Sequence, residues 1–299
     1  MKKLKFVVIG AAESENTKDL KEAAESKGHE CVLMHQSQLV FVTNEGEKMK
    51  VIHDGEDLED FDVFIFRTYS KYLPDSLILA DKLLKDGKVV IDNALGKTFV
   101  LSKMFEASRM SRNNILYPNT FKFVDFAKTK KLLSGASFPV IAKPVDGRQG
   151  RGVTKLENME DACEFLEKQE GDWMVQEYIP IKFDVRVFVV GNKALGAMKR
   201  HLVEGDFRSN IALGAKSEQV ELTSELKKLA VNATKAMDYD VAGVDIIEKD
   251  GELMVLEVNS GPQWQGFKKA TGINPADEIV RYAVSRHQET KSWVRKFLK

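Results

Sequence analysis

Apolar and polar positions along the first third of the chain follow a pattern in which short strands alternate with helices. Lys5 to Ile9 reads as a buried strand, residues 16–28 carry apolar positions at helical spacing, and Cys31 to Met34 reads as a second strand. The pattern then predicts a hairpin, a strand, a helix and another strand, at residues 40–52, 61–66, 75–85 and 89–91. Such alternation is typical of a mostly parallel sheet covered by helices. We therefore expect an α/β fold whose first subdomain covers residues 1–94.

The rest of the chain combines antiparallel hairpins with amphipathic helices. One hairpin is expected at residues 185–198 around Gly191-Asn192, and a second at residues 242–259 around Asp250-Gly251. Strands and helices are also expected at residues 98–111, 120–124, 138–142, 161–169, 173–178, 222–237 and from 279 onward. We expect this part to divide into a central subdomain, residues 95–178, and a C-terminal subdomain, residues 179–299.

Composition narrows the class of protein. The 299 residues are 43% hydrophobic and 30% charged, which is typical of a soluble globular chain. Lys+Arg and Asp+Glu both number 45, so the net charge is zero. The chain therefore lacks the overall positive charge that would favour nucleic acid as a partner. Only Cys31 and Cys163 occur, which fits a reducing compartment. No apolar run is long enough to span a membrane. We expect a cytoplasmic protein with neither a nucleic-acid nor a membrane partner.

The hairpin at residues 242–259 carries candidate metal ligands. Asp245 lies on its first strand, and Glu257 and Asn259 lie on its second strand, where period-two alternation puts both on one face. Three such oxygen donors suit a hard cation, Mg²⁺ or Mn²⁺. An ordinary amphipathic hairpin with a polar face would show the same three residues.

A lysine followed by a glycine-rich loop is a candidate phosphate site. Lys143 ends a predicted strand, and Gly147, Gly150 and Gly152 follow it. Glycines let the backbone approach phosphates with its N–H groups, and the lysine adds a positive charge. A flexible turn beside a solvated lysine is the alternative reading of this stretch.

Three further stretches could bind a nucleotide. Glu177 and Asp184 are candidate acceptors for ribose hydroxyl groups, and Arg186, two positions after Asp184 on the same strand face, could meet a phosphate. In the loop Gly205-Asp206-Phe207-Arg208-Ser209-Asn210, Arg208 and Asn210 could stabilise charge that develops on a transferring phosphoryl group.

Taken in order, seven motifs resemble those of the ATP-grasp superfamily, and within it the RimK-like amino-acid ligases. They are KPVDGRQGRGV, QEYI, DVRVFVVG, EGDFRSN, AGVDI, LEVN and KATGI, and the resemblance covers most of residues 97–290. It implies an ATP-grasp fold with an N-terminal parallel α/β subdomain, a central lid subdomain and a C-terminal α+β subdomain. It also implies ATP and two Mg²⁺ (or Mn²⁺) ions as cofactors.

The resemblance implies a role for each motif residue. The ATP site would comprise Lys103, Lys143, Gly147, Gly150, Gly152, Glu177, Tyr178, Asp184, Arg208, Ser209 and Asn210. The metal ions would be held by Asp245, Glu257 and Asn259, and the catalytic side chains would be Arg186 and Arg208. After Asn259 the chain departs from the family, because Gln263 and Trp264 follow Pro262 where the family has glycine and an apolar residue.

The implied reaction is ATP-dependent joining of a carboxylate to an amine through an acyl phosphate. Glutamate, or a similar amino acid, would be added to a protein, peptide or cofactor acceptor, and a homo-oligomer is left open. Arg67, Arg200 and the pair Lys268-Lys269 are candidate partners for substrate carboxylates, and Trp264 either walls the acceptor pocket or packs under the C-terminal helix. Two alternatives stay open: an ATP-binding regulator with this fold and no ligation, as in synapsin-like proteins, and a dipeptide ligase of another ATP-grasp branch.

Overall fold

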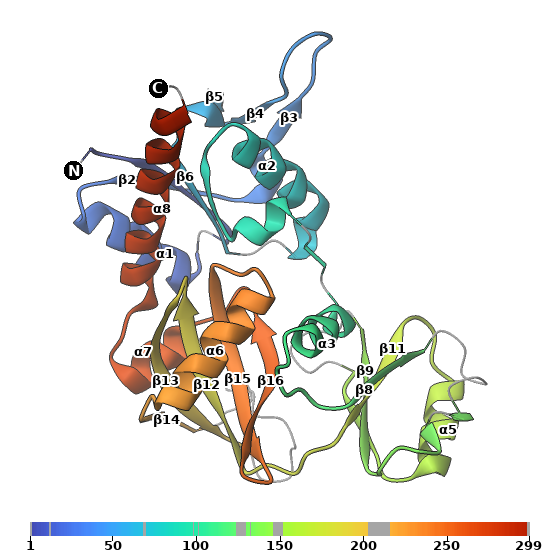
Figure 1. Cartoon of the computed structure of the whole chain (residues 1–299). Helices are drawn as coiled ribbons and strands as arrows, with labels where there is room; N and C mark the ends of the chain where they lie inside the picture. Colours follow the sequence, from blue (N-terminus) through green and yellow to red (C-terminus); the bar gives the residue numbers. More distant parts are fainter. Residues whose placement is uncertain are drawn as a thin grey trace.

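The computed structural model contains three main sheets that follow one another along the chain (Figure 1). It describes residues 2–11, 13–67, 70–97, 99–100, 102–123, 130–131, 133–145, 152–202 and 216–297.

The N-terminal sheet is fully parallel, with strand order β2-β1-β6-β7, as the alternating pattern predicted. Its strands are β1 (Lys5–Ile9), β2 (Glu30–Met34), β6 (Val63–Phe66) and β7 (Val89–Ile91). Phe6 and Val8 pack with helices α1 (Glu15–Ser26) and α8 (Pro275–Phe297), whereas Val7 and Ile9 pack with α2 (Leu73–Lys85) on the opposite face. Both faces are therefore covered, which explains the continuous apolar run in β1.

A small antiparallel sheet extends from this part. The predicted hairpin is present as β3 (Val40–Val42) and β4 (Lys50–His53), and β5 (Glu56–Asp57) adds a third strand. Short 3₁₀ helices connect the neighbouring elements: η1 (Gln36–Gln38), η2 (Leu58–Asp60), η3 (Ser70–Tyr72) and η4 (Asn93–Gly96).

The central sheet is antiparallel, with order β10-β9-β11-β8. Its strands are β8 (Thr120–Phe123), β9 (Val140–Pro144), β10 (Thr154–Leu156) and β11 (Trp173–Glu177), of which β10 was not predicted. Helix α5 (Met159–Glu167) covers one face, where Ala162 and Leu166 pack on Val140 and Val175.

Helix α3 (Lys103–Arg112) lies between the central and C-terminal sheets (Figure 1). It begins five residues later than predicted, because Ser102 caps it by accepting a hydrogen bond from the Phe105 N–H. Its first residue donates a backbone hydrogen bond to Val145 of the central part, and Met110 packs into the C-terminal core.

The C-terminal sheet has order β14-β13-β12-β15-β16 and is antiparallel. Its strands are β12 (Phe183–Val190), β13 (Lys193–His201), β14 (Ser217–Val220), β15 (Val241–Lys249) and β16 (Glu252–Asn259). Helix α6 (Ser224–Ala236) covers one face, and α7 (Gln265–Thr271) and α8 cover the other, so that residues of β12 point alternately into two cores. Strand β14 and helix α7 were not predicted.

Both predicted C-terminal hairpins are present. In the β15–β16 turn, Asp250 and Gly251 have φ of 53° and 84°, the two positive values that a tight hairpin turn of this kind requires. The subdomain boundaries at residues 94 and 178 remain our interpretation of the chain, and each falls between two sheets.

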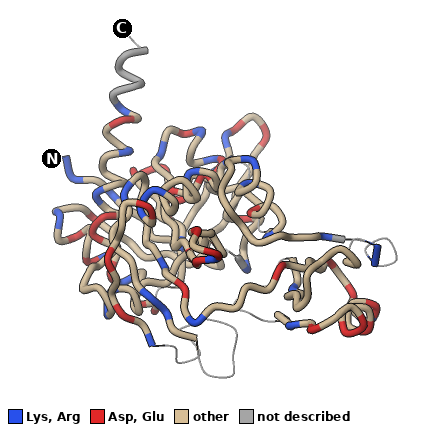
Figure 2. Tube along the Cα trace, turned by 60° about the horizontal axis from the view of Figure 1, so that its bottom comes forward, with Lys and Arg blue, Asp and Glu red and all other residues tan. Residues whose placement is uncertain are grey.

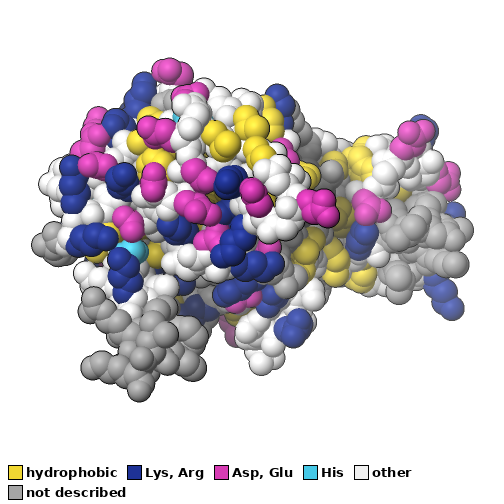
Figure 3. All heavy atoms as spheres, turned by 90° about the horizontal axis from the view of Figure 1, so that it is seen from above, with side chains coloured by type: hydrophobic (Ala, Val, Ile, Leu, Met, Phe, Trp, Pro, Cys, Tyr) yellow, Lys and Arg dark blue, Asp and Glu magenta, His cyan; other side chains and the backbone are white. Residues whose placement is uncertain are grey.

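The surface carries both signs of charge. Basic and acidic residues are interspersed along the trace, and helix α5 carries a group of acidic residues (Figure 2). On the face seen from above, Lys and Arg side chains lie among Asp and Glu side chains (Figure 3). None of the described helices combines the length and apolar character that crossing a bilayer requires.

Candidate active site

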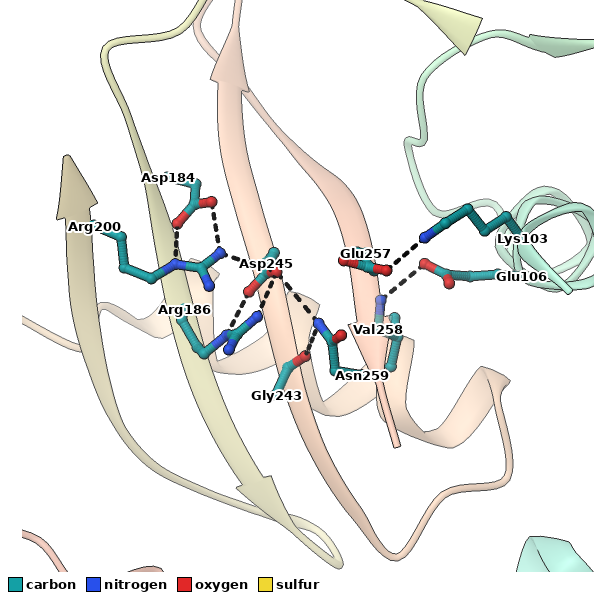
Figure 4. A network of polar contacts seen from close by, with 10 residues as sticks. All are labelled: Lys103, Glu106, Asp184, Arg186, Arg200, Gly243, Asp245, Glu257, Val258 and Asn259. Atoms are coloured by element: carbon teal, nitrogen blue, oxygen red, sulfur yellow. Dashed lines mark hydrogen bonds and ion pairs between the residues drawn. The ribbon is translucent and has the colours of Figure 1, made fainter. Parts of the chain in front are cut away.

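The three predicted metal ligands share one face of the β15–β16 hairpin (Figure 4). Asp245 lies opposite Glu257, and Gly243 lies opposite Asn259. The register shifts by one residue after the Asp245 position; without this bulge, Leu256 would lie opposite Asp245. Bulges commonly re-aim side chains beside functional sites. Here the bulge brings a second carboxylate, in place of a leucine, next to the first.

Two arginines neutralise Asp245, which is 3% exposed. Arg186 donates from Nε to Oδ1 and from Nη2 to Oδ2, both at 2.7 Å, and Arg200 Nη2 lies 2.9 Å from Oδ2 (Figure 4). Burial alone would raise the pKa of Asp245, but the two guanidinium charges outweigh it and hold the pKa below its usual value. Asp245 is therefore ionised in this state.

Asp184, for which a role at the ATP ribose is predicted, pairs with Arg200 in this structure. Both of its oxygens accept hydrogen bonds from Arg200, at 2.7 and 2.6 Å, and the side chain is almost fully buried. The structure thus gives Asp184 the task of orienting Arg200 toward Asp245. Burial lowers the pKa of Arg200, but Asp245 and Asp184 raise it more, so the arginine stays charged.

The second carboxylate of the hairpin is paired with a lysine. Lys103, the first residue of α3, donates to Glu257 Oε1 at 2.6 Å. Burial would raise the pKa of Glu257, but Lys103 lowers it below its usual value. Both carboxylates are therefore anionic and each is balanced by cations of the chain.

Lys143 reaches the same region from the central sheet. Its Nζ donates to Gln176 Oε1 at 2.6 Å. Burial and the nearby Lys103 lower the pKa of Lys143 to about 8. Because its hydrogen bond is to a neutral amide, a phosphate would be a stronger partner for the charge of this lysine.

Glu177 and Tyr178 lie at the end of β11. Glu177 forms an ion pair with Lys249 and accepts from the Asn119 side chain at 2.9 Å. Lys155 Nζ lies 4.5 Å from the centre of the Tyr178 ring. Gly152 packs against Pro144 beside the same sheet. Gly147, Gly150, Arg208, Ser209 and Asn210 lie outside the described residues.

The candidate substrate residues after Asn259 join two parts of the chain. Trp264 is fully buried, packs on Phe188 and Phe267, and donates to Asp19 Oδ2 at 2.8 Å. Arg67 stacks over the Trp264 ring at 4.5 Å and donates to the Pro262 carbonyl at 2.6 Å. Of the two readings offered for Trp264, the structure supports packing beneath the C-terminal helices, not a pocket wall.

Two other candidate cations already have partners within the chain. Lys268 donates to Asp19 Oδ1 at 2.7 Å. Arg200 bridges Asp184 and Asp245. A substrate carboxylate would therefore have to share either side chain with these partners.

Two polar residues of the site, Glu106 and the partly buried Tyr117, were not predicted. Glu106, 6% exposed, accepts from the Val258 N–H at 2.8 Å, between Glu257 and Asn259 (Figure 4). Burial and then Glu257 raise the pKa of Glu106 to about 8. Burial, and then the charges of Glu106 and Glu257, raise the pKa of Tyr117 above its usual value. In the sequence, the only feature that pointed to Glu106 was its spacing of three residues from Lys103, which puts both side chains on one helix face.

The donor set fits a hard divalent cation. Two carboxylates and an amide meet on one face, with Asn259 Nδ2 3.3 Å from Asp245 Oδ2. Within the described ranges, no group of three or more His, Cys, Asp or Glu side chains is arranged to hold a metal ion, so the Asn259 amide is needed to complete a set of three donors.

A parallel α/β part followed by two antiparallel sheets, one bearing Lys143 and the other the paired carboxylates, is the arrangement of a nucleotide-dependent ligase of the ATP-grasp class. Residues 102–283 match the RimK-like ATP-grasp domain. The chain belongs to this family.

Relatives and solved structures agree with this assignment. The probable alpha-L-glutamate ligase 1 of Shewanella sp. (strain MR-4) is 34% identical over 275 residues, which are 89% of this chain and 90% of the relative. The ATP-grasp ligase PsnB, solved with a phosphomimetic variant of its minimal precursor, Mg and ADP, has a TM-score of 0.72 at 20% identity and covers 94% of this chain and 98% of its own. The macrocyclase MdnC of Microcystis aeruginosa MRC, bound with the precursor peptide MdnA, has a TM-score of 0.73 at 12% identity, with coverages of 94% and 100%.

The two structural neighbours establish the fold, and the family establishes the activity. The protein is an ATP-dependent ligase that forms amide bonds. Family membership and the intact carboxylate pair set aside the reading of an ATP-binding regulator without ligation.

Proposed function

We propose that this ligase adds L-glutamate, or a closely similar acidic amino acid, to the carboxylate of a peptide or protein. The observation that carries the proposal is the 34% identity, along nine-tenths of both chains, to relatives named as probable alpha-L-glutamate ligases. The titles of PsnB and MdnC name bound precursor peptides, which supports a peptide as the acceptor.

The residues of the site suit the binding of ATP between the central and C-terminal sheets. Lys143 and Lys103 would hold phosphate oxygens, and Glu177 and Tyr178 lie where the adenine and ribose would be held. Two Mg²⁺ or Mn²⁺ ions, held by Asp245, Glu257 and Asn259, would supply neutralisation of the phosphate charge.

The reaction would proceed in two steps. The acceptor carboxylate attacks the γ-phosphorus of ATP, which gives an acyl phosphate and ADP. The amine of glutamate then attacks the acyl carbon, loses a proton, and displaces inorganic phosphate to leave an amide. Arg186 and Arg200 lie beside Asp245, where their charge would be available to the phosphoryl group during transfer, and Arg208 would act with them.

We further propose that the protein works in the cytoplasm. Both cysteines are free, Cys31 in the core and Cys163 partly exposed, as a reducing compartment would leave them. Burial raises the pKa of Cys31 to about 12, so this thiol stays protonated and unreactive.

Mass spectrometry of the products tests the proposal. The protein is incubated with ATP, Mg²⁺, an amino-acid panel and peptides that end in a free carboxylate, with C-terminally amidated peptides as matched controls. We expect the mass of one or more glutamyl residues to be added only to peptides that have a free carboxylate. Preference for a neutral or basic amino acid would overturn the glutamate assignment and leave the ligase assignment in place.

A further inference from the structure

We propose that Asp19, on helix α1 of the N-terminal part, is a positioning residue for ligation. It holds the segment of residues 260–268, which follows the candidate metal ligand Asn259, and thereby fixes where the Asn259 amide points. The inference rests on the metal site of the proposed function and adds to that site a residue from outside the central and C-terminal sheets. The contacts run from Asp19, through Trp264 and Pro262, to Asn259.

Three donors of this segment meet the buried carboxylate of Asp19. Trp264 Nε1 and Gln265 Nε2 both donate to Oδ2 at 2.8 Å, and Lys268 Nζ donates to Oδ1 at 2.7 Å. Asn16, three residues earlier on the same face of α1, accepts from Gln265 Nε2 at 3.0 Å. Two polar residues of one helix face therefore hold the start of α7 from the N-terminal part.

Arg67 holds the same segment at a second point. It directly follows β6, its guanidinium lies 4.5 Å from the centre of the Trp264 ring, and it donates to the Pro262 carbonyl oxygen at 2.6 Å. Because indole is a rigid plane, its hydrogen bond to Asp19 and its stacking contact with Arg67 together define the orientation of the ring. Pro262 is therefore held both through its own carbonyl group and through Trp264.

Pro262 connects these contacts to the metal site. It packs on Gly243 so closely that a Cβ added to Gly243 would lie 2.9 Å from Pro262 Cβ. Gly243 lies opposite Asn259, and its carbonyl oxygen accepts from Asn259 Nδ2 at 3.3 Å (Figure 4). With the nitrogen donating there, the amide oxygen is the atom that can bind a cation. Because only two residues separate Asn259 from Pro262, a shift of Pro262 would move this oxygen relative to Asp245.

Packing alone does not require a carboxylate at position 19. Leu20 and Ala23 of α1 already pack in the core that contains Trp264. Burial raises the pKa of Asp19, but the hydrogen bonds from Lys268 and its neighbours outweigh burial and hold the pKa below its usual value. A buried charge of this kind loses hydration, a cost that an apolar side chain would avoid. What the carboxylate adds is a defined position for the segment that donates to it.

The experiment compares Asp19→Ala, Asp19→Asn and Trp264→Phe with wild type and with Lys27→Met. Lys27 is the matched control, because it ends the same helix α1 and pairs with Asp277 of α8, outside the segment that follows Asn259. Calorimetry measures the Kd for ADP in EDTA and in Mg²⁺, and steady-state assays give kcat and the Mg²⁺ concentration for half-maximal rate. Thermal unfolding gives Tm for every variant.

We expect Asp19→Ala to raise the Mg²⁺ concentration for half-maximal rate about threefold to tenfold, less than the loss of a direct partner of a ligand costs a metal site. The Kd for ADP in EDTA should not change, since the nucleotide then binds without the metal. Trp264→Phe keeps the aromatic packing and removes one donor, so it should raise the Mg²⁺ requirement by a smaller factor. Asp19→Asn keeps an oxygen that can accept from Trp264 and should restore most of the wild-type behaviour. Lys27→Met should change Tm alone.

If Asp19→Ala and Trp264→Phe lower Tm but leave the Mg²⁺ requirement and the effect of Mg²⁺ on ADP affinity unchanged, Asp19 is merely structural and the inference is overturned. An equally high Mg²⁺ requirement in Asp19→Asn and Asp19→Ala would also count against it. Should Asp19→Ala fail to fold, Trp264→Phe decides between the two outcomes.

The same measurements separate this inference from the proposed function. A wild-type protein that binds ADP and Mg²⁺ but adds no glutamate would defeat the proposed function alone. The ADP affinities in EDTA and in Mg²⁺ would still decide the role of Asp19.

Discussion

Arg200 bridges two carboxylates, with its Nη2 2.6 Å from Asp184 Oδ2 and 2.9 Å from Asp245 Oδ2. Asp245 is thus both a candidate metal ligand and the counter-ion of a buried arginine. Substitution by alanine removes the carboxylate and the hydrogen-bond acceptor together, whereas substitution by asparagine removes the negative charge and keeps an oxygen that can accept from the arginine.

We predict that Asp245→Asn abolishes turnover and retains most of the stability, whereas Asp245→Ala also unfolds more easily. Removing one partner of a buried ion pair costs about 3–5 kcal/mol, and Asn keeps an oxygen that can accept from Arg186 or Arg200. Urea unfolding and ADP release measure the two effects. Glu248→Gln, an exposed change on the same strand, is the control. Full activity in Asp245→Asn would rule out its role as a metal ligand.

We predict that Lys143→Met weakens ADP binding about tenfold to a hundredfold, the usual range for a hydrogen bond to a charged group. The methionine keeps the length of the side chain and removes the charge beside Gln176. Titration calorimetry gives the affinity. Lys168→Met, at an exposed ion pair on α5, is the matched change on the same subdomain and should have no effect. Unchanged affinity in Lys143→Met would make this lysine an ordinary structural one.

We predict that Gly243→Ala impairs the site, although only a methyl group is added. A Cβ at this position would lie 2.9 Å from Pro262 Cβ and 3.5 Å from Arg186 Cδ, so the segment after Asn259 or the arginine has to move. Gly261→Ala is the control, because its Cβ would meet only the Arg67 carbonyl oxygen, at 3.6 Å. Turnover and Tm compare the two variants. Equal activity in both would show that the close contact is relieved without harm.

We predict that Asp92→Asn stabilises the protein increasingly as pH rises above 4. Burial and the neighbouring Asp240 raise the pKa of Asp92 well above 3.8, its usual value, while Tyr282 and Arg286 bind Asp240 from α8. Because its pKa is higher in the folded state than in the unfolded state, protonated Asp92 adds to the free energy of unfolding. This contribution is complete below pH 3.8 and is lost as pH rises through the folded-state pKa. Asparagine at position 92 cannot ionise, so the variant does not lose this stability as pH rises. Its side chain can still accept the hydrogen bond from the Asp240 N–H.

Tm measured from pH 4 to 8 tests this prediction. Asp81→Asn, at an exposed ion pair on α2, controls for the removal of one charge. A constant difference in Tm between Asp92→Asn and wild type across this range would show that Asp92 titrates normally.

Most of the fold could be predicted from the sequence, because local patterns specify it. Lys5 to Ile9 is apolar at successive positions, which requires two covered faces, and both faces are covered. The positive φ angles needed at Asp250 and Gly251 marked the hairpin that carries Asp245 and Glu257. Both observations depend on residues close together in the chain.

The pairings within the site could not be predicted, because they depend on register. Counting back from the Gly191-Asn192 turn would place Lys199 opposite Asp184, but a bulge between Phe188 and Val189 places Arg200 there. The contact from Glu106 to Val258 spans 152 residues and depends on how α3 docks. No local sequence pattern encodes the bulge or the docking of α3.

The contacts along the outer side of β16 have a consequence for association between molecules. The N–H groups of Val255 and Val258 are taken by the Leu116 carbonyl and by Glu106. An exposed edge strand is a template on which other chains can pair and aggregate. Helix α3 and the residues that follow it therefore shield the edge of β16 as well as contacting it. Variants that weaken the packing of α3 are expected to be less soluble as well as less active.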